Sequence, residues 1–153
     1  GTAIYQYTQL SALSIFDSNY TGYVLSEQRG EPAGSALAKA YQDGEMDKVT
    51  ALFLDLKQPT APDYFYAGNA YLQLNNPQEA IRQFLQLVAV NKTNKPTVFE
   101  DDTDYFLAMA YLKNGQVKEA ESLFEKIHNT TGHRYNDKVN SWLLWKIKHV
   151  GNK

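Results

Sequence analysis

The sequence Tyr64–Phe84 reads YFYAGNAYLQLNNPQEAIRQF, and Asp104–Phe124 reads DYFLAMAYLKNGQVKEAESLF. The two stretches lie 40 residues apart and share six identical positions: Ala70, Tyr71, Leu72, Glu79, Ala80 and Phe84 return as Ala110, Tyr111, Leu112, Glu119, Ala120 and Phe124. Self-similarity at a fixed period of roughly 20–50 residues indicates a repeat protein. Apolar residues three and four apart within each copy favour helices with one buried face. The repeated unit is therefore expected to be a pair of helices.

Turn residues divide each copy in two. Asn75-Asn76-Pro77 and Asn114-Gly115 are typical of helix breaks, and Pro77 suits the first turn of the helix that follows. Small side chains such as Gly68 let paired helices approach closely, and large ones such as Phe84 fill the space between them. We expect helices near 32–42, 45–57, 62–74, 77–90, 102–113 and 116–129.

The spacing of these residues resembles the tetratricopeptide repeat. That family reads W-x2-L-G-x2-Y and then A-x3-F, and here Tyr64-x2-Ala67-Gly68-x2-Tyr71 precedes Ala80-x3-Phe84. The second copy is weaker in its front half but keeps Ala120-x3-Phe124, and a degenerate earlier copy aligns Gly44, Val49 and Phe53 with Gly115, Ala120 and Phe124. The resemblance implies an all-α fold, a right-handed superhelix of about three helical hairpins.

The expected domain covers residues 31–150, with repeats at about 31–60, 61–94 and 101–131 and a capping helix at 136–150. The family period is about 34 residues, so the additional residues between the two strong copies are expected in the polar loop 91–100. The capping stretch carries Trp142 and Trp145 among Leu143, Leu144 and Ile147. We expect a closing helix that buries both tryptophans; a tryptophan-based partner site is the alternative.

Residues 1–30 do not fit the repeat and are expected to form an N-terminal arm that packs on it. A helix through Ile4 to Phe16 is followed by an irregular aromatic stretch, Asp17–Tyr23. The order of Phe16-Asp17, aromatic loop, Arg29-Gly30-Glu31 and repeats resembles a class of bacterial envelope proteins. That resemblance implies a periplasmic or envelope location behind an upstream membrane anchor; otherwise the domain is expected in the cytoplasm.

Composition and motifs argue against an enzyme. The chain has no cysteine, so a thiol nucleophile and a zinc-finger site are excluded. An isoelectric point near 5.9 argues against a nucleic-acid partner. His128, His133 and His149 are expected to be surface or packing residues, and the acidic run Glu100–Asp104 to favour the positive end of a helix dipole. We predict no catalytic residue, no metal and no cofactor.

Function is then expected to come from a surface. The tetratricopeptide resemblance implies a concave groove that holds a protein or peptide partner. Alignment with the family places seven residues on this groove, six of them apolar or aromatic: Tyr41, Phe65, Asn69, Leu72, Tyr105, Met109 and Leu112. Of these only Asn69 matches the family's carboxylate clamp, so capture of a C-terminal carboxylate is not expected.

An apolar groove of this kind needs a cover. Either a partner peptide occupies it, or the arm folds back on it through Ile15, Phe16, Tyr20, Tyr23 and Leu25. The first alternative predicts a non-enzymatic protein-interaction module. The second predicts a purely structural or oligomerisation domain whose groove is filled by its own arm.

Overall fold

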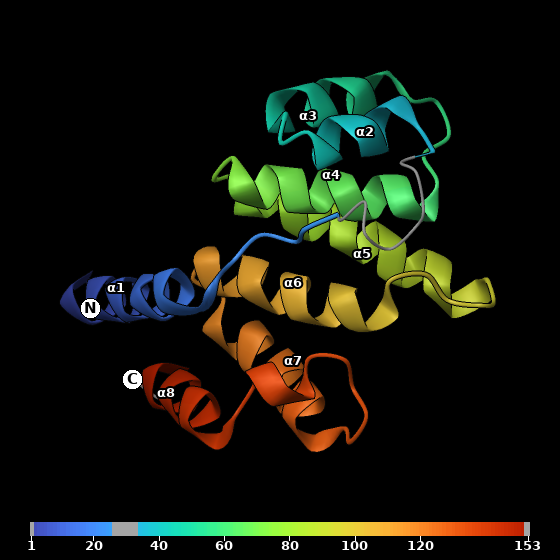
Figure 1. Cartoon of the computed structure of the whole chain (residues 1–153). Coiled ribbons are helices and arrows are strands. Elements are labelled where there is room, and N and C mark those ends of the chain that lie inside the picture. The colour runs from blue at the N-terminus through green and yellow to red at the C-terminus, as the bar shows by residue number, and fades with distance from the viewer. Residues whose placement is uncertain (1, 26–33, 152–153) are drawn as a thin grey trace. The chain divides into compact units, whose positions relative to one another are not determined.

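The computed structural model describes residues 2–25 and 34–151, with only the helical backbone given for residues 2–10. This part of the chain contains helices and no strand (Figure 1). The elements are α1 (Thr2–Asn19), α2 (Ala36–Gln42), α3 (Met46–Asp55), α4 (Ala61–Gln73), α5 (Pro77–Thr93), α6 (Glu100–Lys113), α7 (Val117–Asn129), the short 3-10 turn η2 (Asn136–Lys138) and α8 (Ser141–Gly151). The predicted all-α fold of tetratricopeptide-like helical hairpins is confirmed.

The chain divides into two compact units. Unit 1 combines Gly1–Tyr20 with Glu100–Lys153, and unit 2 is the continuous segment Thr21–Phe99 between them. This division differs from the predicted one, which set a whole arm of residues 1–30 against a repeat domain of residues 31–150. The arm is instead shared between the units, because α1 packs in unit 1 whereas Thr21–Leu25 runs along unit 2.

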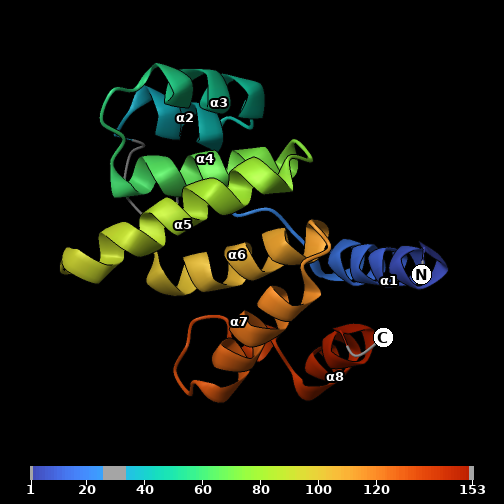
Figure 2. The same ribbon diagram turned by 180° about the vertical axis from the view of Figure 1, so that it is seen from behind.

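Unit 2 consists of two helical hairpins, α2–α3 and α4–α5, with α3 packed beside α4 (Figure 2). The first helix of each hairpin begins at a capping residue: the Ser35 side chain accepts from the Ala38 N–H at 3.0 Å, and Thr60 forms a capping box with Asp63. Gly44, with φ 78°, and Asn75, with φ 62°, close the two hairpins in the left-handed conformation that glycine and asparagine adopt most readily. The helix breaks inside the two hairpins of unit 2 therefore lie within one residue of the predicted positions, after residue 42 and after residue 74.

The contact between α4 and α5 depends on one glycine. A Cβ atom added to Gly68 would lie 2.6 Å from Cε1 of Phe84, whose side chain is completely buried. The predicted pairing of a small residue with a large one across this hairpin is confirmed.

Unit 1 is formed from the two ends of the chain. The hairpin α6–α7 turns at Gly115, with φ 78°, and α8 packs beside α7. Helix α1 lies against both α6 and α8, so the first and last helices are neighbours (Figures 1 and 2). Ala12, Ile15 and Phe16 are buried on α1, which fixes its C-terminal half within this unit.

Several helix ends differ from the predictions. Helix α1 continues to Asn19, so the start of the stretch predicted to be irregular is helical, and the side-chain amide of Asn19 donates to the Ile15 carbonyl at 2.8 Å. Helix α5 extends to Thr93, which shortens the predicted loop 91–100 to the residues before Glu100. The predicted start of the first repeat, at 31–33, lies outside the described residues. Within the described part, none of the helices has the length and hydropathy needed to span a membrane.

Candidate functional site

The residues predicted to line the groove are all buried. None of the seven side chains is more than 5% exposed: Tyr41, Phe65, Asn69 and Leu72 belong to unit 2, and Tyr105, Met109 and Leu112 to unit 1. They therefore do not form an open surface in this structure. That a partner binds them stays a prediction.

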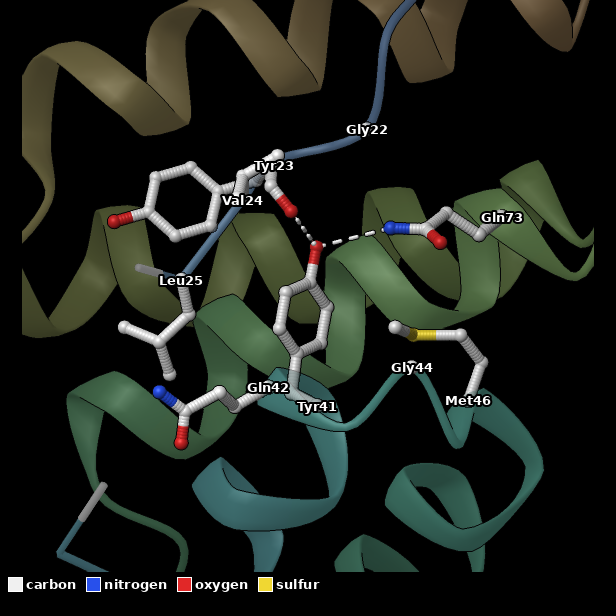
Figure 3. A pocket seen from close by; sticks show the side chains of 9 residues that line it. All are labelled: Gly22, Tyr23, Val24, Leu25, Tyr41, Gln42, Gly44, Met46 and Gln73. Carbon is white, nitrogen blue, oxygen red and sulfur yellow. Dashed lines mark hydrogen bonds between the residues drawn. The ribbon is translucent and has the colours of Figure 1, made fainter. Parts of the chain in front are cut away.

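In unit 2 a tyrosine of the arm covers the groove positions. The Tyr23 ring meets Phe65 edge to face, with centroids 4.8 Å apart, and lies 6.3 Å from the Tyr41 ring. The Tyr41 hydroxyl donates a 2.6 Å hydrogen bond to the Tyr23 carbonyl and accepts one from the Gln73 amide at 3.0 Å (Figure 3). The segment Thr21–Leu25 has no helical structure, and its Tyr23 contacts Tyr41 of α2 and Phe65 of α4.

Phe99 completes this aromatic cluster from the other end of unit 2. Its ring stacks on Phe65 with centroids 4.1 Å apart and planes 12° apart, and it meets Tyr23 at 6.0 Å. Phe99 has φ 54°, a conformation that aromatic residues rarely adopt. Asn91 supports the preceding turn, because its amide both donates to the Val98 carbonyl and accepts from the Val98 N–H, each at 2.9 Å. Asn91 was predicted only to begin a polar loop, so its two hydrogen bonds to Val98 were not predicted.

A cavity of about 320 Å³ opens beside Tyr23. Its lining residues come from the arm, α2, the α2–α3 turn, the start of α3 and α4 (Figure 3): Gly22, Tyr23, Val24, Leu25, Tyr41, Gln42, Gly44, Met46 and Gln73. Val24 is 74% exposed at its edge, although its neighbour Tyr23 is buried. Tyr23 therefore covers Tyr41 and Phe65, and the cavity beside it is left open.

In unit 1 the groove position Tyr105 is covered by the loop after α7. The Tyr135 ring stacks on Tyr105 with centroids 4.5 Å apart and planes 10° apart. Burial of Tyr105 raises the pKa of its phenol above the ordinary value. This ring is therefore part of a packed core.

The acidic start of α6 anchors the same loop. Asp101 accepts from the Arg134 N–H at 2.9 Å, and Asp102 accepts from the Tyr135 hydroxyl at 2.6 Å. Asp104 lies 3.0 Å from Nε2 of His133 and 2.9 Å from the Lys126 ammonium. Glu100, Asp101 and Asp102 do occupy the first turn of α6, as the dipole interpretation predicts, but their tertiary partners were not foreseen.

Asp101, Asp104 and His133 present three ligand atoms within 4.8 Å of one another, a geometry that could hold a metal ion. The hydrogen bonds of His133 argue against it. Its Nδ1 accepts from the Tyr135 N–H at 3.1 Å, so the proton is on Nε2 and is donated to Asp104. A metal bound at Nε2 would require the proton to lie on Nδ1. There it would face the Tyr135 N–H, so two donors would oppose each other. The carboxylates beside His133 were not foreseen from the sequence, but its burial fits the surface or packing role predicted for the three histidines.

Two family models match the helical hairpins described above. Residues 64–94, which span α4 and α5, match the tetratricopeptide repeat. The chain therefore contains a helical repeat of the tetratricopeptide type. Residues 106–129, within α6 and α7, match the PPR repeat. No curated protein and no solved structure matches the chain.

The capping helix differs from its prediction in one respect. Helix α8 follows the repeats as expected, and Leu143, Leu144 and Ile147 are buried on it. Trp142 and Trp145, however, are 63% and 53% exposed. The expectation that this helix buries its tryptophans was wrong, because α7 and α1 contact the aliphatic face of α8 and leave the aromatic face to solvent.

Proposed function

We propose that this protein is a non-enzymatic scaffold for protein–protein interaction whose unit 2 groove is filled by its own segment Thr21–Leu25. The observation that carries the proposal is Tyr23, which lies across Tyr41 and Phe65 with its carbonyl bonded to the Tyr41 hydroxyl. Repeat arrays of this kind use their concave faces to bind partners. The arm segment acts as an internal ligand, and a partner segment with an aromatic anchor would replace Tyr23.

An internal ligand lowers the apparent affinity for an external one, because only the arm-released state can bind it. A labelled peptide of residues 20–25 tests this. We expect it to bind a Tyr23→Ala variant and not the wild-type chain, as read by fluorescence anisotropy. A control peptide with alanine in place of its second tyrosine should bind neither protein. Equal binding of the first peptide to wild type and variant would contradict the proposal.

The burial of all seven groove residues favours a second candidate, a purely structural or oligomerisation domain. In that case the arm is a permanent part of the core and is never displaced. Sedimentation velocity at several concentrations separates the two. A monomer that gains peptide binding in the Tyr23→Ala variant supports the scaffold, and a concentration-dependent oligomer with no such gain supports the structural domain.

Non-enzymatic function is supported by the family, whose repeats serve as scaffolds, and by the engagement of His133. Both ring nitrogens of His133 already have partners, Tyr135 and Asp104, so neither is available as a general base. An RNA-binding role of the kind PPR arrays perform is not favoured. The matched hairpin begins beside Asp101, Asp102 and Asp104, and the net charge of the chain is −2, which repels a phosphate backbone.

For location, we propose the bacterial periplasm or envelope, behind an upstream membrane anchor. The support is the resemblance of residues 16–31 to anchored envelope proteins, of which residues 26–31 lie outside the described part. Fractionation of cells that express the full gene product tests it. Recovery in the membrane fraction with protease sensitivity from the periplasmic side is expected, and recovery in the cytoplasm would contradict it.

A further inference from the structure

Helix α8 carries a ladder of three stacked aromatic rings, which we call the α8 ladder: Trp142, Trp145 and His149. The two indoles stack with centroids 5.2 Å apart and planes 5° apart, and the imidazole stacks on Trp145 at 5.0 Å and 9°. Spacings of three and four residues place all three on one helix face. Exposure of both tryptophans is unusual, because such large apolar side chains are mostly buried or placed at interfaces.

The ladder is held outward by the rest of its helix. Leu143, Leu144, Ile147 and Val150 are buried on the opposite side, against α7 and α1 of the same unit. Turning the tryptophans inward would bring these four aliphatic side chains into water. The aromatic face is therefore a fixed feature of unit 1.

Positive charge is concentrated in the same part of the chain. Residues 138–153 contain four lysines and no acidic residue, so they carry +4, and the other 137 residues carry −6 of the total −2. The Lys146 ammonium lies over the Trp142 ring, 5.6 Å from its centroid. Lys148 is bridged to Glu125 of α7, and Glu121 of the same helix also faces it. The ladder and the lysines together complement a negatively charged partner.

We propose that the α8 ladder docks on an anionic lipid surface. Tryptophan rings favour the headgroup level of a bilayer, where one part of the ring is apolar and the N–H stays near polar groups. Helices that lie on membranes combine such rings with lysines, and lysines are attracted to anionic headgroups. Because the Trp145 ring already stacks on both of its neighbours, little of its face is left for stacking on nucleic-acid bases. This surface is additional to the groove of unit 2 and does not depend on it.

The chain offers a direct probe, since Trp142 and Trp145 are its only tryptophans. Intrinsic fluorescence therefore reports on the ladder alone. With phosphatidylglycerol vesicles we expect a blue shift of the emission, quenching by brominated acyl chains, and flotation of the full chain with the vesicles. Phosphatidylcholine vesicles should give none of these, and added salt should weaken the binding.

Variants distinguish binding through the α8 ladder from non-specific adsorption to vesicles. Trp142→Ser with Trp145→Ser should abolish flotation with phosphatidylglycerol vesicles, and Lys138→Gln with Lys146→Gln should weaken it several-fold. Leu54, on α3 of unit 2, is 73% exposed, so Leu54→Ser removes a comparably exposed apolar side chain and should leave flotation unchanged. Unchanged circular dichroism confirms that each variant folds.

Three results would overturn the proposal. The first is absence of any fluorescence change with phosphatidylglycerol vesicles. The second is equal flotation of the wild type and the double tryptophan variant. The third is a tryptophan response to an acidic polypeptide or to heparin but not to vesicles, which would assign the surface to an acidic macromolecule. None of these results bears on displacement of Tyr23, so the scaffold proposal stands or falls separately.

Discussion

Gly68 faces the ring of Phe84 so closely that a Cβ atom on the glycine would lie 2.6 Å from Cε1 of the phenylalanine. The ring is completely buried and cannot swing away without opening a gap elsewhere in the core. This contact sets the distance between α4 and α5. It also explains why the matched tetratricopeptide repeat keeps glycine in the middle of a helix, where the residue is otherwise unfavourable.

Gly68→Ala should destabilise the chain. Overpacking costs about 1–3 kcal/mol, and the better helix propensity of alanine returns up to about 1 kcal/mol, so a net loss of about 1–2 kcal/mol is expected. Urea denaturation followed by circular dichroism measures it. Gly34→Ala is the matched control, because a Cβ there meets nothing within 4 Å. Equal urea midpoints for the two variants would show that the α4–α5 hairpin accommodates the added methyl group without loss of stability.

Tyr41→Phe should loosen the arm on unit 2. The change removes the donor to the Tyr23 carbonyl and the acceptor for Gln73, and a net loss of about 1 kcal/mol is expected. Limited proteolysis at residues 21–25 should become faster, which separates a local release from global unfolding. Tyr71→Phe on the adjacent helix α4 is the control and should leave the cleavage rate unchanged. Unaltered cleavage in Tyr41→Phe would mean that ring packing alone retains the segment.

Tyr135→Phe should destabilise unit 1. The Tyr135 hydroxyl donates a buried 2.6 Å hydrogen bond to Asp102, whose other described partner is Arg134 at 3.4 Å. Because a buried carboxylate loses a close donor, we expect a loss of about 1–3 kcal/mol. Thermal denaturation measures it, with Tyr111→Phe on α6 as the control. A melting temperature equal to that of the control would show that Arg134 or water replaces the lost donor.

Tyr20→Phe should have the opposite effect. Its hydroxyl is buried and has no hydrogen-bond partner among the described residues, so its removal is expected to stabilise the chain by about 1 kcal/mol. Burial also raises the pKa of Tyr20. Below the unfolded-state pKa of about 10, both states keep the proton and stability does not depend on it.

The pH dependence of Tyr20 follows from the direction of that shift. Above about pH 10 the unfolded chain releases the proton while the folded chain retains it, so stability falls as pH rises. Tyr20→Phe should therefore reduce the alkaline loss of stability, as measured by urea midpoints near neutral pH and near pH 11. An identical alkaline slope in wild type and variant would contradict this assignment.

The sequence predicted the hairpins well because their determinants are local. Gly68 and Phe84 lie within one repeat, and Asn75 and Gly115 mark turns by their own conformational preferences. Whether the predicted groove residues are covered was harder to predict, because the cover is Tyr23, which is distant in sequence from Phe65. Self-occupation by the arm and occupation by a partner are both compatible with the sequence, and periodicity alone does not choose between them.

The remaining differences have similar causes. Asp104 and His133 meet only because the loop after α7 folds back on α6, and the one available signal was the sequence His133-Arg134-Tyr135 opposite an acidic run. The helical pattern of α8 was recognised, but its apolar residues surround more than one face. The sequence therefore did not reveal that aliphatic side chains would take the inner face and the indoles the outer one.

The sharing of unit 1 between both ends of the chain has a consequence during biosynthesis. Unit 2 is continuous, so it can fold as soon as it leaves the ribosome, before α6 to α8 have been translated. Helix α1 is translated before unit 2 but packs on α6 and α8, so its buried residues Ile15 and Phe16 stay uncovered until those later helices have been made. We expect chaperones that bind exposed apolar segments to bind the nascent chain at α1.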